Sequence, residues 1–253
     1  MTYHPSAEAL EQWFTSPLGQ TVLQWENEKN DSIVSNAFGY HAVQIGMPSV
    51  NFLRSNRIRT KMILTEEIPD RYVDNDNLQY LKGSVEEIPL PTDSVDLVIL
   101  PHTLELHQNP HAILREVDRV LVHDGRLVIM GFNPHSLWGL RNACGLKAVS
   151  PILNKQQVAV HRVKDWLQLL SFEIDRGHFG LYIPACQSSQ WIQRWDFMNK
   201  AGNRWWSAAG AVYIISAKKY TAGMHIIGPA WRRKQASDRQ TAPVAQKDTI
   251  YYD

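Results

Sequence analysis

Short apolar runs alternate with longer segments of helical periodicity from residue 41 onward. Alternation of this kind is typical of a mostly parallel sheet with helices on both of its faces. The pattern therefore predicts an α/β fold, a doubly wound, Rossmann-like, seven-stranded and mostly parallel sheet. The expected strands are 41–46, 61–66, 78–81, 95–100, 126–131, 172–176 and 211–220.

The clearest helix is expected between the fourth and fifth strands. Apolar residues recur there on one helical face, and Asn109-Pro110 precede them as a start signal, with Gly125 as the stop. A second helix is expected over 161–172, directly before the sixth strand. The apolar face of the first helix consists of Ile113, Leu114, Val117, Val120 and Leu121.

Three segments lie outside this repeating pattern. Residues 6–29 predict two short amphipathic helices, broken at Ser16-Pro17 and packed outside the main sheet. An aromatic-rich insertion over 182–210 precedes the last strand. The apolar pattern stops near residue 232, where a flexible tail is expected. The expected organisation is a helical extension (1–40), one main domain (41–231) and a tail (232–253).

The insertion carries several tryptophans. Trp191, Ile192, Trp195 and Met198 share one face if the segment is helical. Such a face docks onto its own domain, caps an apolar acceptor or forms a dimer contact, and the sequence leaves these alternatives open.

Composition narrows the classes of partner. The chain has 26 Lys and Arg against 25 Asp and Glu, a net charge of +1, so no global field recruits nucleic acid. Its two cysteines have no metal-ligand spacing, and no metal site is expected. No run of 18 apolar residues or export signal is present, so the expected location is cytoplasmic, without a membrane span.

The segment 83–131 resembles the core of the type 11 class I methyltransferases. That family has the order G-D-A-x-x-L-P-F, S-F-D-x-V, L-x-H-x-x-D-P and L-x-E-x-x-R-V-L-x-P-G-G. The resemblance is specific over about residues 41–131 and implies the class I methyltransferase fold and S-adenosylmethionine as cofactor. The matching positions are Gly83, Pro89, Ser94, Asp96, Val98, Leu104, Pro110, Leu114, Glu116, Arg119, Val120, Leu121 and Gly125.

The expected cofactor site lies at the ends of the first four strands. Gly46 follows the first strand, where a residue without Cβ lets the backbone approach a ligand. Twenty residues later, Glu66 and Glu67 close the second strand, at the spacing of a carboxylate that binds ribose hydroxyls. Glu66 is the favoured candidate, and solvated loop charges are the alternative.

Several positions depart from the family pattern. The family's Asp-Ala, which contacts adenine, is Ser84-Val85 here, and the glycine-rich turn keeps one glycine. Serine offers one hydrogen bond and no charge. The histidine before Asp-Pro is Leu106, and Asp-Pro is Asn109-Pro110. Because of these departures, the sequence leaves four alternatives open: a conventional cofactor site, a weakened one, a rearranged one, or loss of cofactor binding.

The segment after the fourth strand faces the methyl donor in related enzymes. Pro101 and His102 are therefore expected at the cofactor, and Glu105 towards the acceptor. An imidazole titrates near neutrality, so His102 is a candidate general base, with a polar loop residue as the alternative.

Acceptor recognition is expected beyond the fifth strand, because ligands of open α/β sheets bind outside the carboxyl ends of the strands. The candidates are Asn133, His135, Trp138, Arg141 and, from the insertion, Tyr182.

Three functions follow as hypotheses. The first is an S-adenosylmethionine-dependent methyltransferase acting on a small or mid-sized acceptor. The second is a catalytically inactive relative retained for binding or regulation. The third, a dinucleotide-dependent oxidoreductase, is disfavoured because G-x-G-x-x-G is absent. The acceptor and the oligomeric state stay open.

Overall fold

The computed structural model describes residues 5–67, 78–145, 149–151, 158–184, 189–195 and 197–220. Residues up to 221 form one compact unit. The expected tail at 232–253 lies outside the described residues.

Seven strands form a single sheet in the order β3-β2-β1-β4-β5-β7-β6. The first five strands pair in parallel, and β7 runs antiparallel to both of its neighbours, β5 and β6. The predicted α/β class, strand count and mostly parallel sheet are therefore confirmed. The strands are β1 (His41–Ile45), β2 (Thr60–Thr65), β3 (Leu78–Lys82), β4 (Val95–Pro101), β5 (Leu121–Phe132), β6 (Phe172–Gly180) and β7 (Val212–Lys219).

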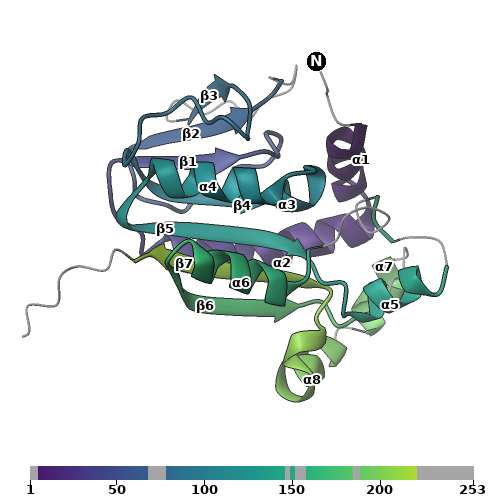
Figure 1. Cartoon of the computed structure of the whole chain (residues 1–253). Coiled ribbons are helices and arrows are strands. Elements are labelled where there is room, and N and C mark those ends of the chain that lie inside the picture. Colours follow the sequence, from purple (N-terminus) through teal and green to yellow (C-terminus); the bar gives the residue numbers. More distant parts are fainter. Residues whose placement is uncertain are drawn as a thin grey trace, which may run out of the picture. The chain divides into compact units, whose positions relative to one another are not determined.

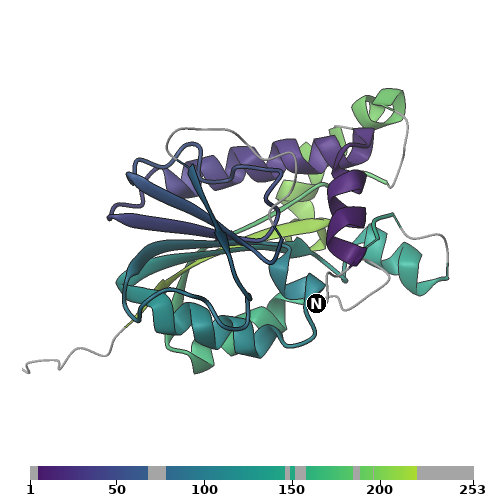
Figure 2. The same cartoon turned by 90° about the horizontal axis from the view of Figure 1, so that it is seen from above.

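Helices cover both faces of the sheet (Figures 1 and 2). On one face, α4 (Pro110–Val120) and α6 (Val160–Leu169) bury their apolar sides. On the other, α2 (Pro17–Val34) packs against the sheet, and α1 (Pro5–Phe14) packs against α2 at the carboxyl ends of the strands. The helix expected after the fourth strand is confirmed, and its N-terminal Pro110 occupies the first turn, where a missing N–H does no harm.

The two N-terminal helices belong to the core. Leu10 and Phe14 of α1 and Val22 of α2 are buried against the sheet. Ser16 caps α2 by accepting a hydrogen bond from Gly19 N. A Cβ at Gly19 would lie 2.3 Å from the carbonyl oxygen of Trp13, so the close corner between the helices requires glycine.

Expected helices are absent from two connections among the described residues. The pattern predicts helical segments between successive strands, but 83–94 between β3 and β4 has none, and 46–59 between β1 and β2 contains only turns and irregular backbone. Gln44, a polar residue inside β1, holds this loop: its amide donates to the carbonyls of Gly46, Met47 and Val50 and accepts from Phe52 N. Phe52 and Leu53 fill the space that a helix would occupy.

The aromatic insertion contains two short helices, α7 (Ser189–Arg194) and α8 (Phe197–Trp205), and the 3-10 turn η1 (Ser207–Ala209). The single helical face expected over 191–198 is therefore interrupted after Arg194. Trp195 packs partly against the core, whereas Trp191 is exposed. No described helix is long and apolar enough to cross a membrane.

Candidate functional site

The carboxyl ends of the parallel strands point towards the same edge of the sheet, and α1 stands across this edge in both views (Figures 1 and 2). Glu11 of α1 hydrogen-bonds to Ser49 in the turn after β1, and burial is the main reason why the pKa of Glu11 is raised. The helix therefore contacts the turn in which ligands of this fold class are expected.

The turn after β1 is built for close approach. Gly46 has φ +87°, a conformation that side chains disfavour, and its N–H donates to Leu64 O at 2.9 Å. A Cβ at Gly46 would have one neighbour within 4 Å, Thr103 Oγ1 at 3.3 Å. That hydroxyl donates to Ile45 O at 2.5 Å, which ties the end of β1 to the segment after β4. A side chain at position 46 would therefore meet the Thr103 hydroxyl in a tight contact as well as a disfavoured backbone conformation, so the turn requires glycine.

Glu66 lies directly after β2, with its side chain 37% exposed. Its Oε1 is 3.9 Å from Nε2 of His107, whose Nδ1 is bonded to Thr103 O at 2.8 Å. Because β1 lies between β2 and β4 in the sheet, these two side chains flank the end of β1. Glu67 is exposed. Of the two carboxylates, Glu66 is the one that lies near His107 of the segment after β4.

The loop after β3 carries Ser84 and Val85. Ser84 is exposed, and its Oγ accepts from Glu86 N at 3.2 Å, so its own proton is not used in that bond. Val85 is buried in the core on the α4 side. A hydroxyl donor is therefore available where the family has a carboxylate.

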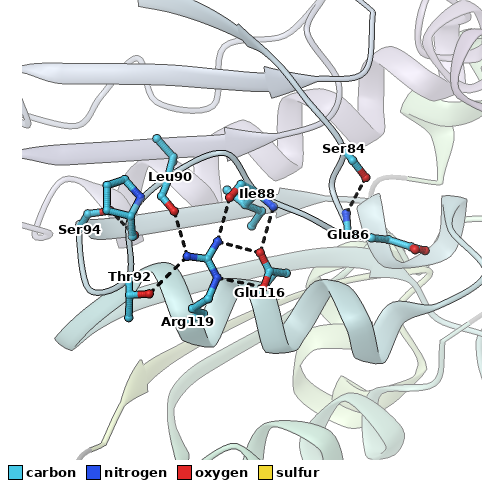
Figure 3. Close-up of polar contacts among 9 residues, drawn as sticks. Ser84, Glu86, Ile88, Leu90, Thr92, Ser94, Glu116 and Arg119 are labelled. Carbon is cyan, nitrogen blue, oxygen red and sulfur yellow. Dashed lines mark hydrogen bonds and ion pairs between the residues drawn. The ribbon is translucent and has the colours of Figure 1, made fainter.

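Two family positions on α4 hold this same loop (Figure 3). Arg119 donates to the carbonyls of Ile88 and Leu90 at 2.8 and 2.9 Å, and to Glu116. Glu116 in turn accepts from Ile88 N at 3.0 Å. The pKa of Glu116 is lowered, first by its hydrogen bonds to Arg119. The Glu-x-x-Arg spacing thus fixes the loop between β3 and β4 from one helix face.

His102 is completely buried at the end of β4. Its Nε2 lies 2.9 Å from Glu26 Oε1 on α2, and its Nδ1 lies 3.1 Å from Glu105 Oε2 on α3 (Thr103–Leu106). The second oxygen of Glu105 accepts from Phe132 N at 2.8 Å. These contacts join α2, β4 and β5 through three buried ionisable side chains.

Burial alone would lower the pKa of His102, but the carboxylates of Glu26 and Glu105 outweigh it and raise the pKa to about 10. Burial raises the pKa of Glu105, against the effect of His102. The imidazole is therefore a cation with both N–H groups donated. Nothing in this geometry leaves a nitrogen open to take a proton from a substrate, so the general-base role predicted for His102 is not favoured, and Glu105 is likewise sealed from an acceptor.

The residues expected to bind the acceptor divide into two groups. Asn133 donates to the carbonyls of Ala208 and Gly210, and Trp138 donates to Ile183 O, each from a buried side chain. Tyr182 is buried as well, with its ring against Gly202. Their packing gives these three a structural role. His135 and Arg141 are exposed.

Sequence reasoning missed Glu26, Gln44 and Thr103. Glu26 interrupts the apolar row of α2 four residues after Val22, and Gln44 interrupts an apolar strand. A charged or amide side chain on a buried face is itself a signal, because it needs a buried partner. No comparable signal marks Thr103.

Residues 57–129 match the family model described as a methyltransferase domain. Together with the strand order, this identifies the fold. The chain has the class I methyltransferase fold, and its segment 57–129 is similar to the methyltransferase domain of that family model. The match includes β2, β3, β4 and α4. It therefore contains Glu66 and Ser84, in the loops after β2 and β3, and Glu116 and Arg119 on α4.

Solved methyltransferases share the fold at low sequence identity. The Thermotoga maritima SAM-dependent methyltransferase, described as a possible histamine N-methyltransferase, is 18% identical, with a TM-score of 0.58 over 83% of this chain and 93% of that chain. The Archaeoglobus fulgidus SAM-dependent methyltransferase is 17% identical, with a TM-score of 0.53 over 79% and 94%.

A complex of the Haloferax volcanii Trm112 methyltransferase activator with its methyltransferase gives a TM-score of 0.61 at 15% identity, over 87% of this chain and 100% of that chain. Among curated proteins, the uncharacterized protein YafS of Escherichia coli K12 is 45% identical over 87 residues, which are 34% of this chain and 36% of YafS. The match thus spans about a third of the relative's length.

Proposed function

We propose that this protein is an S-adenosylmethionine-dependent methyltransferase that acts on a small or mid-sized acceptor. The observation that carries the proposal is the glycine turn at Gly46, with its positive φ, together with the carboxylate of Glu66 after the neighbouring strand β2. This arrangement suits a nucleoside: backbone without Cβ for close approach and a carboxylate for ribose hydroxyls. The family match supports the choice of cofactor.

Each strand end contributes one contact in this proposal. Glu66 accepts hydrogen bonds from the ribose, and the Ser84 hydroxyl donates towards the base. Thr103 keeps the turn after β1 and the segment after β4 in register. The cofactor supplies an already activated methyl group on its sulfonium. The chain is left with alignment of the acceptor and exclusion of water, and we assign the second task to α1, which stands across this edge of the sheet.

Of the residues expected to bind the acceptor, the proposal keeps only those whose side chains are exposed to solvent. His135 and Arg141 lie exposed beyond β5 and are retained as acceptor contacts. His102 is omitted as a base, because both of its nitrogens are committed to carboxylates. The proposal therefore favours an acceptor whose nucleophilic atom needs no help from a buried base.

Isothermal titration with S-adenosylhomocysteine tests the site. Glu66→Gln should weaken binding at least about tenfold, because charge-assisted hydrogen bonds to a ligand are worth about 1.5–3 kcal/mol each. Glu67→Gln, one position further and exposed, is the matched control and should leave the affinity unchanged. Equal losses in both variants, or no binding by the unaltered protein, would refute the proposed cofactor site.

A catalytically inactive binding protein is the second candidate. The sealed His102 and the single glycine in the turn after β1 favour it. Mass spectrometry of lysate metabolites incubated with the protein and deuteromethyl-labelled cofactor separates the two functions. Transfer of label to any metabolite supports the enzyme, whereas binding of S-adenosylhomocysteine without transfer supports the inactive relative.

A further inference from the structure

A hollow of about 320 Å³ lies between the start of α4 and one face of α6. These two helices cover the face of the sheet opposite α2 (Figures 1 and 2). The methyl-transfer proposal makes no use of the hollow. Its walls include Gln108, Asn109, His111, Arg115, Arg162 and Trp166.

The two helices present matching pairs of side chains to the hollow. His111 and Arg115 are four residues apart on α4, and Arg162 and Trp166 are four residues apart on α6, so each pair lies on one helix face. The rings of His111 and Trp166, both in the lining of the hollow, have centroids 4.2 Å apart. The hollow therefore combines an aromatic wall with two guanidinium groups from separate helices.

The positive charge in the hollow is not neutralised. Among the described residues, neither Arg115 nor Arg162 has a carboxylate within salt-bridge distance. Asp118 and Asp165 follow them by three residues on the same helices, yet form no such pair with them. Both arginines are exposed, so water screens their mutual repulsion, and an anion between them would neutralise it further. Arginine is also the side chain best suited to bind phosphate and to lie beside aromatic rings.

We infer that this hollow is a binding site for a phosphate monoester carried on a planar or aromatic body. The phosphate lies between Arg115 and Arg162, and the planar part lies against Trp166. A phosphate dianion matches the two unpaired guanidinium charges, and its oxygens accept from both forks. The inference does not depend on methyl transfer, because it rests only on residues of α4 and α6.

Phenyl phosphate is the probe, with inorganic phosphate and phenol as its two halves. Titrations are made on the full chain, with S-adenosylhomocysteine present at saturation if it binds, so that the nucleoside site does not compete. Phenyl phosphate should bind more tightly than either half. Arg115→Ala and Arg162→Ala should each weaken binding about tenfold, and Arg59→Ala, exposed before β2, should not.

Trp166→Leu separates the aromatic contribution from the charge. It should remove the preference for phenyl phosphate over inorganic phosphate, with circular dichroism confirming that the helices remain. Absence of phenyl phosphate binding to the unaltered protein, or an equal loss in Arg59→Ala, would overturn the inference. If the protein binds S-adenosylhomocysteine but not phenyl phosphate, the inference is overturned and the proposed function stands. If it binds phenyl phosphate but not S-adenosylhomocysteine, the inference stands and the proposed cofactor site is refuted.

Discussion

At the scale of single residues, His102 shows how a histidine after β4 becomes structural. Its backbone adopts φ 54°, an unusual conformation for a residue with a side chain, and this places the ring under Phe14 and beside Phe132. Because the ring is buried away from solvent, its two N–H groups require acceptors within the protein, and the carboxylates of Glu26 and Glu105 supply them. The ring thereby anchors the N-terminal helices to the end of β4.

Stability should depend on the proton of His102. The pKa in the folded chain, about 10, exceeds the ordinary 6.5, so the stabilisation is complete below pH 6.5 and is lost as pH rises towards 10. The raised pKa of Glu105 acts in the same direction above 4.5. Urea unfolding between pH 6.5 and 9.5 should show a decline of up to about 1.4 kcal/mol per pH unit for each proton.

His102→Gln is expected to be less stable at pH 6.5 and to lose most of this pH dependence. His161→Gln, an exposed histidine on α6, is the control and should keep the slope of the unaltered protein. Identical slopes for all three proteins would show that the buried ring does not carry the proton.

At the scale of elements, α4 holds the loop between β3 and β4 in place through side-chain hydrogen bonds. Arg119 reaches two carbonyls of that loop, and Glu116 reaches one N–H (Figure 3). The loop has no helix of its own, so these bonds replace the support that a helix would give. Ser84, at the start of the loop, is positioned indirectly by α4.

Arg119→Ala should destabilise the fold by about 1–2 kcal/mol, since partly exposed charge-assisted bonds lie at the lower end of their range. It should also weaken S-adenosylhomocysteine binding, because the loop bearing Ser84 loosens. Arg115→Ala, one turn earlier on α4 and without a carboxylate partner, should leave both unchanged. Equilibrium unfolding and titration measure the two effects. An unaltered affinity in Arg119→Ala would mean that the loop does not shape the cofactor site.

Periodicity predicted the elements well where one face is buried, as in α4, and every strand was found. It failed over 46–59, because Gln44 stabilises an irregular loop through contacts that no local pattern reveals. β5 also begins at Leu121, earlier than expected, where pairing with Val95 extends it. Family positions led to Gly46 and Glu66, which the structure places after the neighbouring strands β1 and β2, and their binding role stays a prediction. The burial of Asn133 and Trp138 depended on packing against distant segments, which spacing cannot show.

At the scale of the whole molecule, α1 closes the carboxyl edge of the sheet. Trp13 meets Phe132 edge-on at 5.7 Å between centroids, and Phe14 lies 5.7 Å from the ring of His102. The N-terminal segment therefore completes the core at the edge where the cofactor site is proposed.

Phe14→Ala should lower the free energy of unfolding by about 3–4 kcal/mol, because it removes a buried aromatic ring and leaves a cavity. For a unit of this size that corresponds to a melting temperature about 6–16 °C lower. Phe38→Ala, at 75% exposure, is the control and should change little. Differential scanning calorimetry gives both values. A small shift for Phe14→Ala would place α1 outside the core.

The position of β7 affects the order in which the chain can fold. This strand, Val212–Lys219, is the last of the seven along the sequence, yet it lies inside the sheet between β5 and β6. During synthesis, β5 and β6 emerge long before the strand that joins them, and both offer unpaired backbone groups in the meantime. Such late, long-range pairing slows folding and exposes nascent chains to aggregation. Translation rate and chaperone supply over the final part of the chain should therefore govern its yield of folded protein.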